Sequence, residues 1–235
     1  MSFEEIMKQL ELLGNPSTKK TLMNHGAREP FFGVRISDMK PIQKSVKKNY
    51  DLSLNLYNTG ISDAMYLAGL IADEKRMTKK DLHHWVENAY WHMISDYTVA
   101  WVAAESNFGW ELSLEWIESD SDLIASAGWS TLSFLFSLRD ENEFDLSKIN
   151  SLLDFVNHNI HNSMNRTRYS MNGFVISVAT NLPVMREKAI NVANAIGEIS
   201  VDLGGTSCKV PNASEYIQKT LERSPVPKKK KTVRC

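Results

Sequence analysis

The sequence predicts an all-α fold in which antiparallel helix pairs stack into a superhelical array, an α-solenoid. Apolar residues recur four positions apart in nearly every segment, and short polar breaks separate the segments. Aromatic residues mark a faint repeat, because Trp85, Trp116 and Phe155 stand 31 and then 39 residues apart, each before a polar turn and an apolar helix. This spacing brackets the length of a helix-pair repeat, so it favours an array over a closed bundle.

Capping and turn residues define the first helices. Ser2 and Glu5 have the spacing of a capping box, and Gly14-Asn15-Pro16 ends the first helix and starts the next with a proline. The clearest later helix begins at Asp122 and carries apolar residues along one face. Other helices are predicted where apolar residues recur at i and i+4, at Ile42 and Val46, Leu67 and Ile71, Leu82 and Val86, and Leu152 and Val156. Short connections imply roughly a dozen antiparallel helices.

The stretch 199–210 departs from helical spacing. Ile199 to Leu203 alternates with period two and Gly204-Gly205 can turn, so a short β-hairpin is predicted there. A last helix then runs to Arg223. Residues 1–224 are expected to form a single repeat domain, and residues 225–235 a flexible basic C-terminal tail.

The composition excludes several classes of protein. A chain of 235 residues with 43% hydrophobic and 9% aromatic residues is typical of a globular domain, not of a disordered or collagen-like chain. No window approaches the roughly 18 uninterrupted apolar residues of a membrane span, and the N-terminus lacks the start of a secretory signal. We therefore expect a cytoplasmic protein without a membrane partner.

Charge is divided unevenly along the chain. The net charge is −1, yet residues 1–80 carry +4, residues 81–154 carry −12 and residues 155–235 carry +7. If the fold brings the first and last thirds together around one concavity, the protein has a positive surface despite its neutral total. The geometry of the fold therefore decides whether a nucleic acid can be the partner.

No cofactor or metal site is predicted. Cys208 and Cys235 lie far apart and are expected to be free thiols. Walker and dinucleotide-binding loops are absent from the sequence. The histidines share helix faces but have no acidic or sulfur partner at ligand spacing; they are His83, His84, His92, His158 and His161.

Four motifs in a fixed order carry a family resemblance. They are Phe31-Phe32-Gly33-Val34-Arg35-Ile36-Ser37, Ile42-x-Lys44-x-x-Lys47-Lys48, Glu115-Trp116-Ile117-Glu118-Ser119-Asp120 and Gly173-Phe174-Val175. From about Phe31 to Leu221 the chain resembles the DNA alkylation repair family of HEAT-like-repeat DNA glycosylases, the AlkD-like proteins. The segment from Ile199 to Pro211 resembles one branch, AlkF and AlkG, described as binding branched DNA instead of removing alkylated bases.

The resemblance implies a right-handed superhelix of HEAT-like pairs whose concave, positive face holds DNA by its backbone. In active members it implies excision of alkylated purines such as 3-methyladenine and 7-methylguanine. A carboxylate there stabilises the developing sugar cation or positions water, with two indole rings and an arginine nearby. No cofactor is implied.

The sequence departs from that catalytic pattern. The family's Trp-x-x-x-Asp pair falls near Asp96 and Ala100, so the carboxylate is missing from its place, although Asp96 stands one helical turn away and Trp101 lies beside that place. Asp96 and Trp101 are therefore the catalytic candidates, while the later tryptophan matches Phe174 and the arginine matches Ser126. Because losing such charge stabilisation costs about two to three orders of magnitude in rate, we expect base excision to be weak or absent.

Basic and aromatic residues are the candidates for contact with DNA. Lys40, Lys44, Lys47 and Lys48 fall on adjoining helix faces, which suits a phosphate stripe or a solvated face. Other candidates come from the connection before the helix of Phe174 and from the resemblance, and they are Arg166, Arg168, Tyr97 and Phe174.

Three functions remain open from the sequence. The preferred one is a monomeric DNA-binding accessory of repair or recombination, which recognises DNA backbone or branched structure. The second is an active 3-methyladenine/7-methylguanine DNA glycosylase. The third is a protein-binding scaffold, with the acidic residues 81–154 as the interaction surface.

Overall fold

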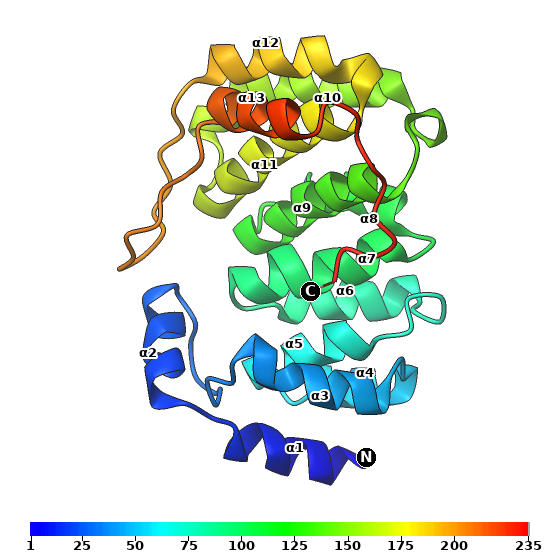
Figure 1. The fold of residues 1–235 in the computed structure, drawn as a ribbon, viewed down its shortest axis with the longest axis vertical. Coiled ribbons are helices and arrows are strands. Elements are labelled where there is room, and N and C mark those ends of the chain that lie inside the picture. The colour runs from blue at the N-terminus through cyan, green and yellow to red at the C-terminus, as the bar shows by residue number, and fades with distance from the viewer. Residues whose placement is uncertain (235) are drawn as a thin grey trace.

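The computed structural model describes residues 1–234, and every regular element in that range is a helix. The helices stack one after another into an elongated array, from the blue α1 to the red α13 in Figure 1. Their bounds are α1 Phe3–Leu12, α2 Pro16–Asn24, α3 Ile36–Val46, α4 Tyr50–Tyr57, α5 Ser62–Ile71, α6 Lys79–Asn88, α7 Ala100–Glu105, α8 Gly109–Trp116, α9 Asp122–Leu138, α10 Leu146–Asn159, α11 Asn165–Asn181, α12 Arg186–Ile196 and α13 Ala213–Arg223. A π-helix, η1 (Met93–Val99), precedes α7, and short 3₁₀ turns are η2 Glu141–Glu143, η3 Ile160–Asn162 and η4 Pro183–Met185.

Four helical segments form the central row of the array. The helices α5, η1–α7, α9 and α11 pack one against the next, while α4, α6 and α8 cover them from outside. Helix α9 begins near the start of η1 and ends near the end of α7, so the row presents all its N-termini on one side. The two sides of this row are where the candidate functional residues gather.

The sequence signals explain where several helices begin. The predicted capping box is present, because the Ser2 hydroxyl accepts the Glu5 N–H and the Glu5 carboxylate accepts the Ser2 N–H. Asn15 caps α2 with Pro16 at its first position, as the sequence indicates. A second capping box, which pairs Thr78 with Asp81, starts α6.

Aromatic residues fill the two halves of the core. Tyr57 stacks on Trp85 at a centroid distance of 4.2 Å in the N-terminal half, and Trp129 meets Phe174 edge-on at 5.0 Å in the C-terminal half. At Gly69 a Cβ atom would lie only 2.5 Å from the Thr98 methyl group, so α5 approaches η1 closely because this residue has no side chain.

The predicted hairpin at 199–210 does not form, because this segment holds no strand. It is an irregular excursion, drawn in orange in Figure 1, that leaves α12, approaches α2 and returns to α13. Its polar groups are satisfied elsewhere: the Asn165 amide exchanges two hydrogen bonds with the Asp202 backbone, and the Asp202 carboxylate accepts the Gly204 N–H. Gly204 lies against the Asn24 carbonyl oxygen, so the turn closes on α2 and not on its own neighbouring run.

The sequence predicts that residues 225–235 form a flexible tail, but residues 225–234 lie along the array (red in Figure 1). The Lys230 N–H donates to the Ser137 carbonyl at the end of α9, and the Thr232 hydroxyl and Val233 N–H donate to Glu105 at the end of α7. The last basic side chain, Arg234, is only 5% exposed. Partners 39 to 162 residues away hold the tail, which is why its own sequence does not reveal the contact. Cys235 lies outside the described residues.

Candidate nucleic-acid interface

Basic residues collect at the two sides of the central row. On the side where the helices of the row begin lies a cavity of about 480 Å³, which we call the Arg166 pocket. On the side where these helices end lies a larger cavity of about 930 Å³, which we call the tail basin. Leu123 of α9 lines the first and Leu138 of the same helix lines the second, so they are separated by about 22 Å at 1.5 Å per residue.

The Arg166 pocket combines aromatic and basic side chains from distant parts of the chain. The central row supplies Tyr97, Arg166 and Tyr169, and the excursion covers the pocket with Asp202 and Lys209. Further lining residues come from the ends of α2 and α6, and they are His25, Arg28, Tyr90, Trp91 and His92. Two of the candidates for DNA contact, Tyr97 and Arg166, thus line the same pocket. The sequence did not indicate four other lining residues, which are Arg28, His92, Tyr169 and Lys209.

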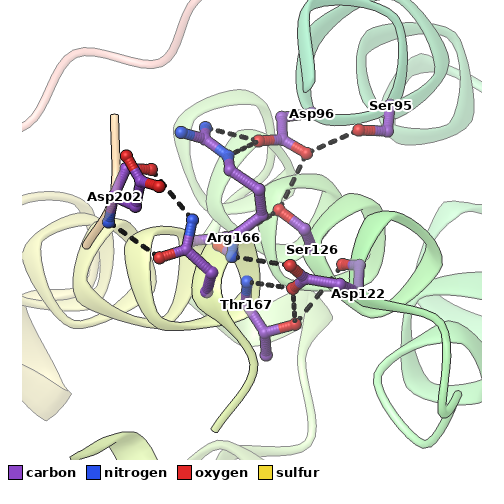
Figure 2. A network of polar contacts seen from close by, with 9 residues as sticks. Ser95, Asp96, Asp122, Ser126, Arg166, Thr167 and Asp202 are labelled. Atoms are coloured by element: carbon purple, nitrogen blue, oxygen red, sulfur yellow. Dashed lines mark hydrogen bonds and ion pairs between the residues drawn. The ribbon is translucent and has the colours of Figure 1, made fainter. Parts of the chain in front are cut away.

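Asp96 lies behind this pocket in a closed polar network (Figure 2). Its Oδ2 accepts the Arg166 Nη2 donor at 2.7 Å and the Nε donor at 3.3 Å. Its Oδ1 accepts the hydroxyl groups of Ser126 at 2.7 Å and Ser95 at 2.8 Å. Both carboxylate oxygens are therefore engaged by the protein itself.

The side chains of the Asp96–Arg166 pair are almost inaccessible, with exposed fractions of 5% and 13%. Burial raises the pKa of Asp96 above its usual value, while the Arg166 charge and the hydroxyl hydrogen bonds oppose that rise. Arg166 lines the pocket and Asp96 does not, but the two charges of the pair cancel, so the unpaired positive charge of the pocket comes from Arg28 and Lys209.

Asp122 fixes the position of Arg166 (Figure 2). This residue begins α9, and its carboxylate accepts the N–H groups of Arg166 and Thr167 at 2.9 and 2.8 Å. It also accepts the Thr167 hydroxyl at 2.9 Å. The Asp122 carboxylate of α9 thus caps the N-terminus of α11. This contact holds Arg166 in the first turn of α11, from which its side chain reaches Asp96.

The remaining catalytic and aromatic candidates differ in accessibility. Trp101 is buried at 2% exposure and packs edge-on against Tyr66 and Tyr97, with centroids 5.6 and 5.8 Å away. Tyr97 is half-buried and lines the Arg166 pocket. Phe174 is fully buried between Trp129 and Phe136, so the expectation that it contacts DNA is wrong. Its ring packs against these two aromatic side chains of α9 in the C-terminal half of the core.

His92 is uncharged at neutral pH. Burial, the positive charge of Arg166 and the nearby His25 lower the pKa of His92 to about 3. Its ring meets Trp91 edge-on at 5.2 Å, so it offers the pocket a neutral polar edge. Arg168, in contrast, does not line the Arg166 pocket or the tail basin, and its Nε is buried without a hydrogen-bond partner.

The tail basin joins the positive first and last thirds of the sequence. The four predicted lysines of the α3 region line it together with the docked tail. Its basic residues are Lys40, Lys44, Lys47, Lys48, Arg139, Lys230, Lys231 and Arg234, and its acidic residues are Glu74 and Glu105. The acidic middle third contributes one carboxylate here, Glu105, so the division of charge seen in the sequence does produce a positive surface.

Other kinds of site are not evident within residues 1–234. No three His, Cys, Asp or Glu side chains there are grouped closely enough to hold a metal ion. No helix in that range has the length and apolarity to cross a bilayer. Cys208 is exposed and free.

Comparison with known proteins identifies the family. The family model described as DNA alkylation repair enzyme matches residues 6–217. The chain belongs to this family. Two relatives of this chain are uncharacterised proteins, one from Listeria innocua with 32% identity and one from Listeria monocytogenes with 31% identity. Each match covers 95% of this chain and 99% of the relative.

A solved structure resembles this DNA alkylation repair family member over its whole length. The two share 43% sequence identity with a TM-score of 0.92, and the match covers 100% of both chains. That structure is described as a new family of proteins related to the HEAT-like repeat DNA glycosylases with affinity for branched DNA structures. The fold predicted from the sequence is confirmed by this similarity.

Proposed function

We propose that this protein binds DNA through its backbone, prefers branched DNA, and does not excise alkylated bases at a useful rate. It acts as an accessory protein in DNA repair or recombination. Membership of the DNA alkylation repair family and the structural relative with affinity for branched DNA support the partner. The absence of base excision is proposed because the Asp96 carboxylate is fully engaged in hydrogen bonds within the protein.

Glycosidic cleavage of an alkylated purine leaves positive charge on the sugar, which a free carboxylate facing the lesion would stabilise. Here the Asp96 carboxylate already accepts hydrogen bonds from Arg166, Ser126 and Ser95. Arg166, the ion-pair partner of Asp96, lines the pocket, whereas Asp96 does not. Asp96 therefore has no free carboxylate charge to offer to a cationic transition state.

The positive charge of the Arg166 pocket suits a DNA backbone. Arg28, Arg166 and Lys209 line the Arg166 pocket against one carboxylate, Asp202. Charge contacts of this kind to phosphate position DNA without reading its sequence. Recognition of DNA form, and not of a base, is the expected result.

The experiment uses the wild-type protein in a gel-shift series with linear duplex, fork and four-way junction DNA at several salt concentrations. We expect the junction to bind more tightly than the duplex, with affinity falling as salt rises because bound counterions are released. Absence of binding to every DNA form at low salt would overturn the proposal. A parallel assay of 3-methyladenine and 7-methylguanine release from methylated DNA is expected to stay at background, and release at the rate of an active glycosylase would contradict the role given to Arg166.

A further inference from the structure

The docked C-terminal tail lines part of the tail basin, through Lys230, Lys231, Thr232 and Arg234. Lys230 and Lys231 stand in it beside Lys40, Lys44 and Lys47, which come from the other end of the sequence. The basin is therefore lined from both ends of the sequence, together with the C-terminal ends of α5, α7 and α9.

Arg234 anchors the tail in this position. Its Nη1 donates to the Ala72 carbonyl at the end of α5 at 2.6 Å, and its Nη2 lies 2.9 Å from the Glu74 carboxylate. Its Nε lies 2.9 Å from the Glu105 carboxylate at the end of α7. The exposed fractions of these three side chains are 5%, 9% and 10%, so the anchor is shielded from water. Lys229 adds hydrogen bonds to the carbonyl groups of Phe136 and Asn181.

The anchor also neutralises the acidic groups of the basin. Arg234 pairs with Glu74 and Glu105, and Lys48 donates to Glu74 at 2.5 Å. Five ammonium groups of the basin have no ion-pair partner within the described chain, and they belong to Lys40, Lys44, Lys47, Lys230 and Lys231. The charge left for a ligand is therefore strongly positive.

The shape and chemistry of the basin fit a polyanion. Lysine ammonium groups are flexible point charges, which bind phosphate without the fixed geometry needed to read a base edge. The cavity of about 930 Å³ has room for more than one phosphate group. We propose that the tail and α3 together form a binding site for the phosphodiester backbone of DNA, and that the tail is thereby part of the DNA interface. This inference rests on the proposed function.

The test compares two charge reversals within the tail. The variant Lys230→Glu/Lys231→Glu changes the basin, and Lys228→Glu is the matched control, because Lys228 is exposed and does not line the basin. Binding to a four-way junction is measured against salt concentration. We expect the double variant to lose about tenfold or more in affinity and its salt slope to fall by about 2, with the control close to wild type. Equal affinity and slope in the double variant and the control would overturn the inference.

A second variant tests the anchor. Arg234→Met removes the ion pairs of the tail with Glu74 and Glu105, which weakens the docking of the segment that carries Lys230 and Lys231. We expect a loss of junction affinity similar to that of the lysine variant, and little further loss when the two are combined. Circular dichroism verifies that each variant is folded. Wild-type affinity in the folded Arg234→Met variant would show that docking of the tail does not matter for DNA. If the wild-type protein binds junctions while all tail variants bind equally well, the inference fails and the proposed function stands.

Discussion

Replacing Arg166 by methionine should destabilise the fold and should do so more strongly at neutral than at acidic pH. The change leaves the Asp96 carboxylate with the hydroxyl groups of Ser126 and Ser95 but without its cation. Breaking a buried ion pair by removing one partner typically costs about 3–5 kcal/mol, because the other charge remains buried.

The structure limits that cost in two ways. Arg166 is 13% exposed, so water reaches part of the space that its side chain leaves. Asp96 can also take up a proton, which costs about 1.36 kcal/mol per pH unit above the usual carboxyl pKa of 3.8. Because burial already raises the pKa of Asp96 in the wild type, these figures are upper limits: the loss is at most about 4 kcal/mol at pH 7 and at most about 2 kcal/mol at pH 5.

The assay is urea unfolding followed by circular dichroism at pH 7 and pH 5, with Lys219→Met as the control. Lys219 pairs with Glu215 on the exposed face of α13, where removal of the ion pair should cost less than about 1 kcal/mol at either pH. A loss below about 1 kcal/mol for Arg166→Met at pH 7, or the same loss at both pH values, would refute this account of the buried pair.

Three further outcomes are expected. Asp122→Ala removes the cap from α11 and should lower the free energy of unfolding by about 1–3 kcal/mol, measured in the same urea assay; no change would argue that the cap is dispensable. His92 should remain neutral from pH 5 to 8 in an NMR titration of its ring, since its pKa lies at about 3, and a midpoint near 6.5 would contradict its burial. Burial raises the pKa of Glu74, but the Lys48 hydrogen bond and the Arg234 charge together lower it by a larger amount. The folded pKa of Glu74 therefore lies below the unfolded value of 4.5. The stability that Glu74 contributes is then present above pH 4.5 and lost as the pH falls through the folded pKa, so the stability difference between wild type and Glu74→Gln should shrink in acid.

Local signals in the sequence predicted the helices well. The Ser2 capping box and the proline at Pro16 mark helix starts through contacts within four residues, so the structure reproduces them. The same holds for the apolar faces of α5 and α9, whose residues are buried in the central row. The aromatic repeat likewise predicted a solenoid, because each helix pair buries its apolar face against the next pair in the same way.

The errors lie where a residue has two competing partners that are distant in sequence. Alternation at 199–210 suggests a hairpin, yet Asn165 binds the backbone of Asp202 and removes groups that a ladder would need. The family resemblance assigns Phe174 to DNA contact, but the ring is fully buried against Trp129. The spacing of apolar residues along the chain cannot predict the missing hairpin or the burial of Phe174. Both depend on which helix packs next to the segment.

The sequence by itself determined the helices, their stacking order and the uneven division of charge, because neighbouring residues set all three. Only the tertiary structure decided that Arg166 neutralises Asp96 across 70 residues and that Arg234 joins the tail to Glu74 across 160 residues. Such pairs form because burial makes an unpaired charge costly, and burial is a property of the packed array and not of any segment.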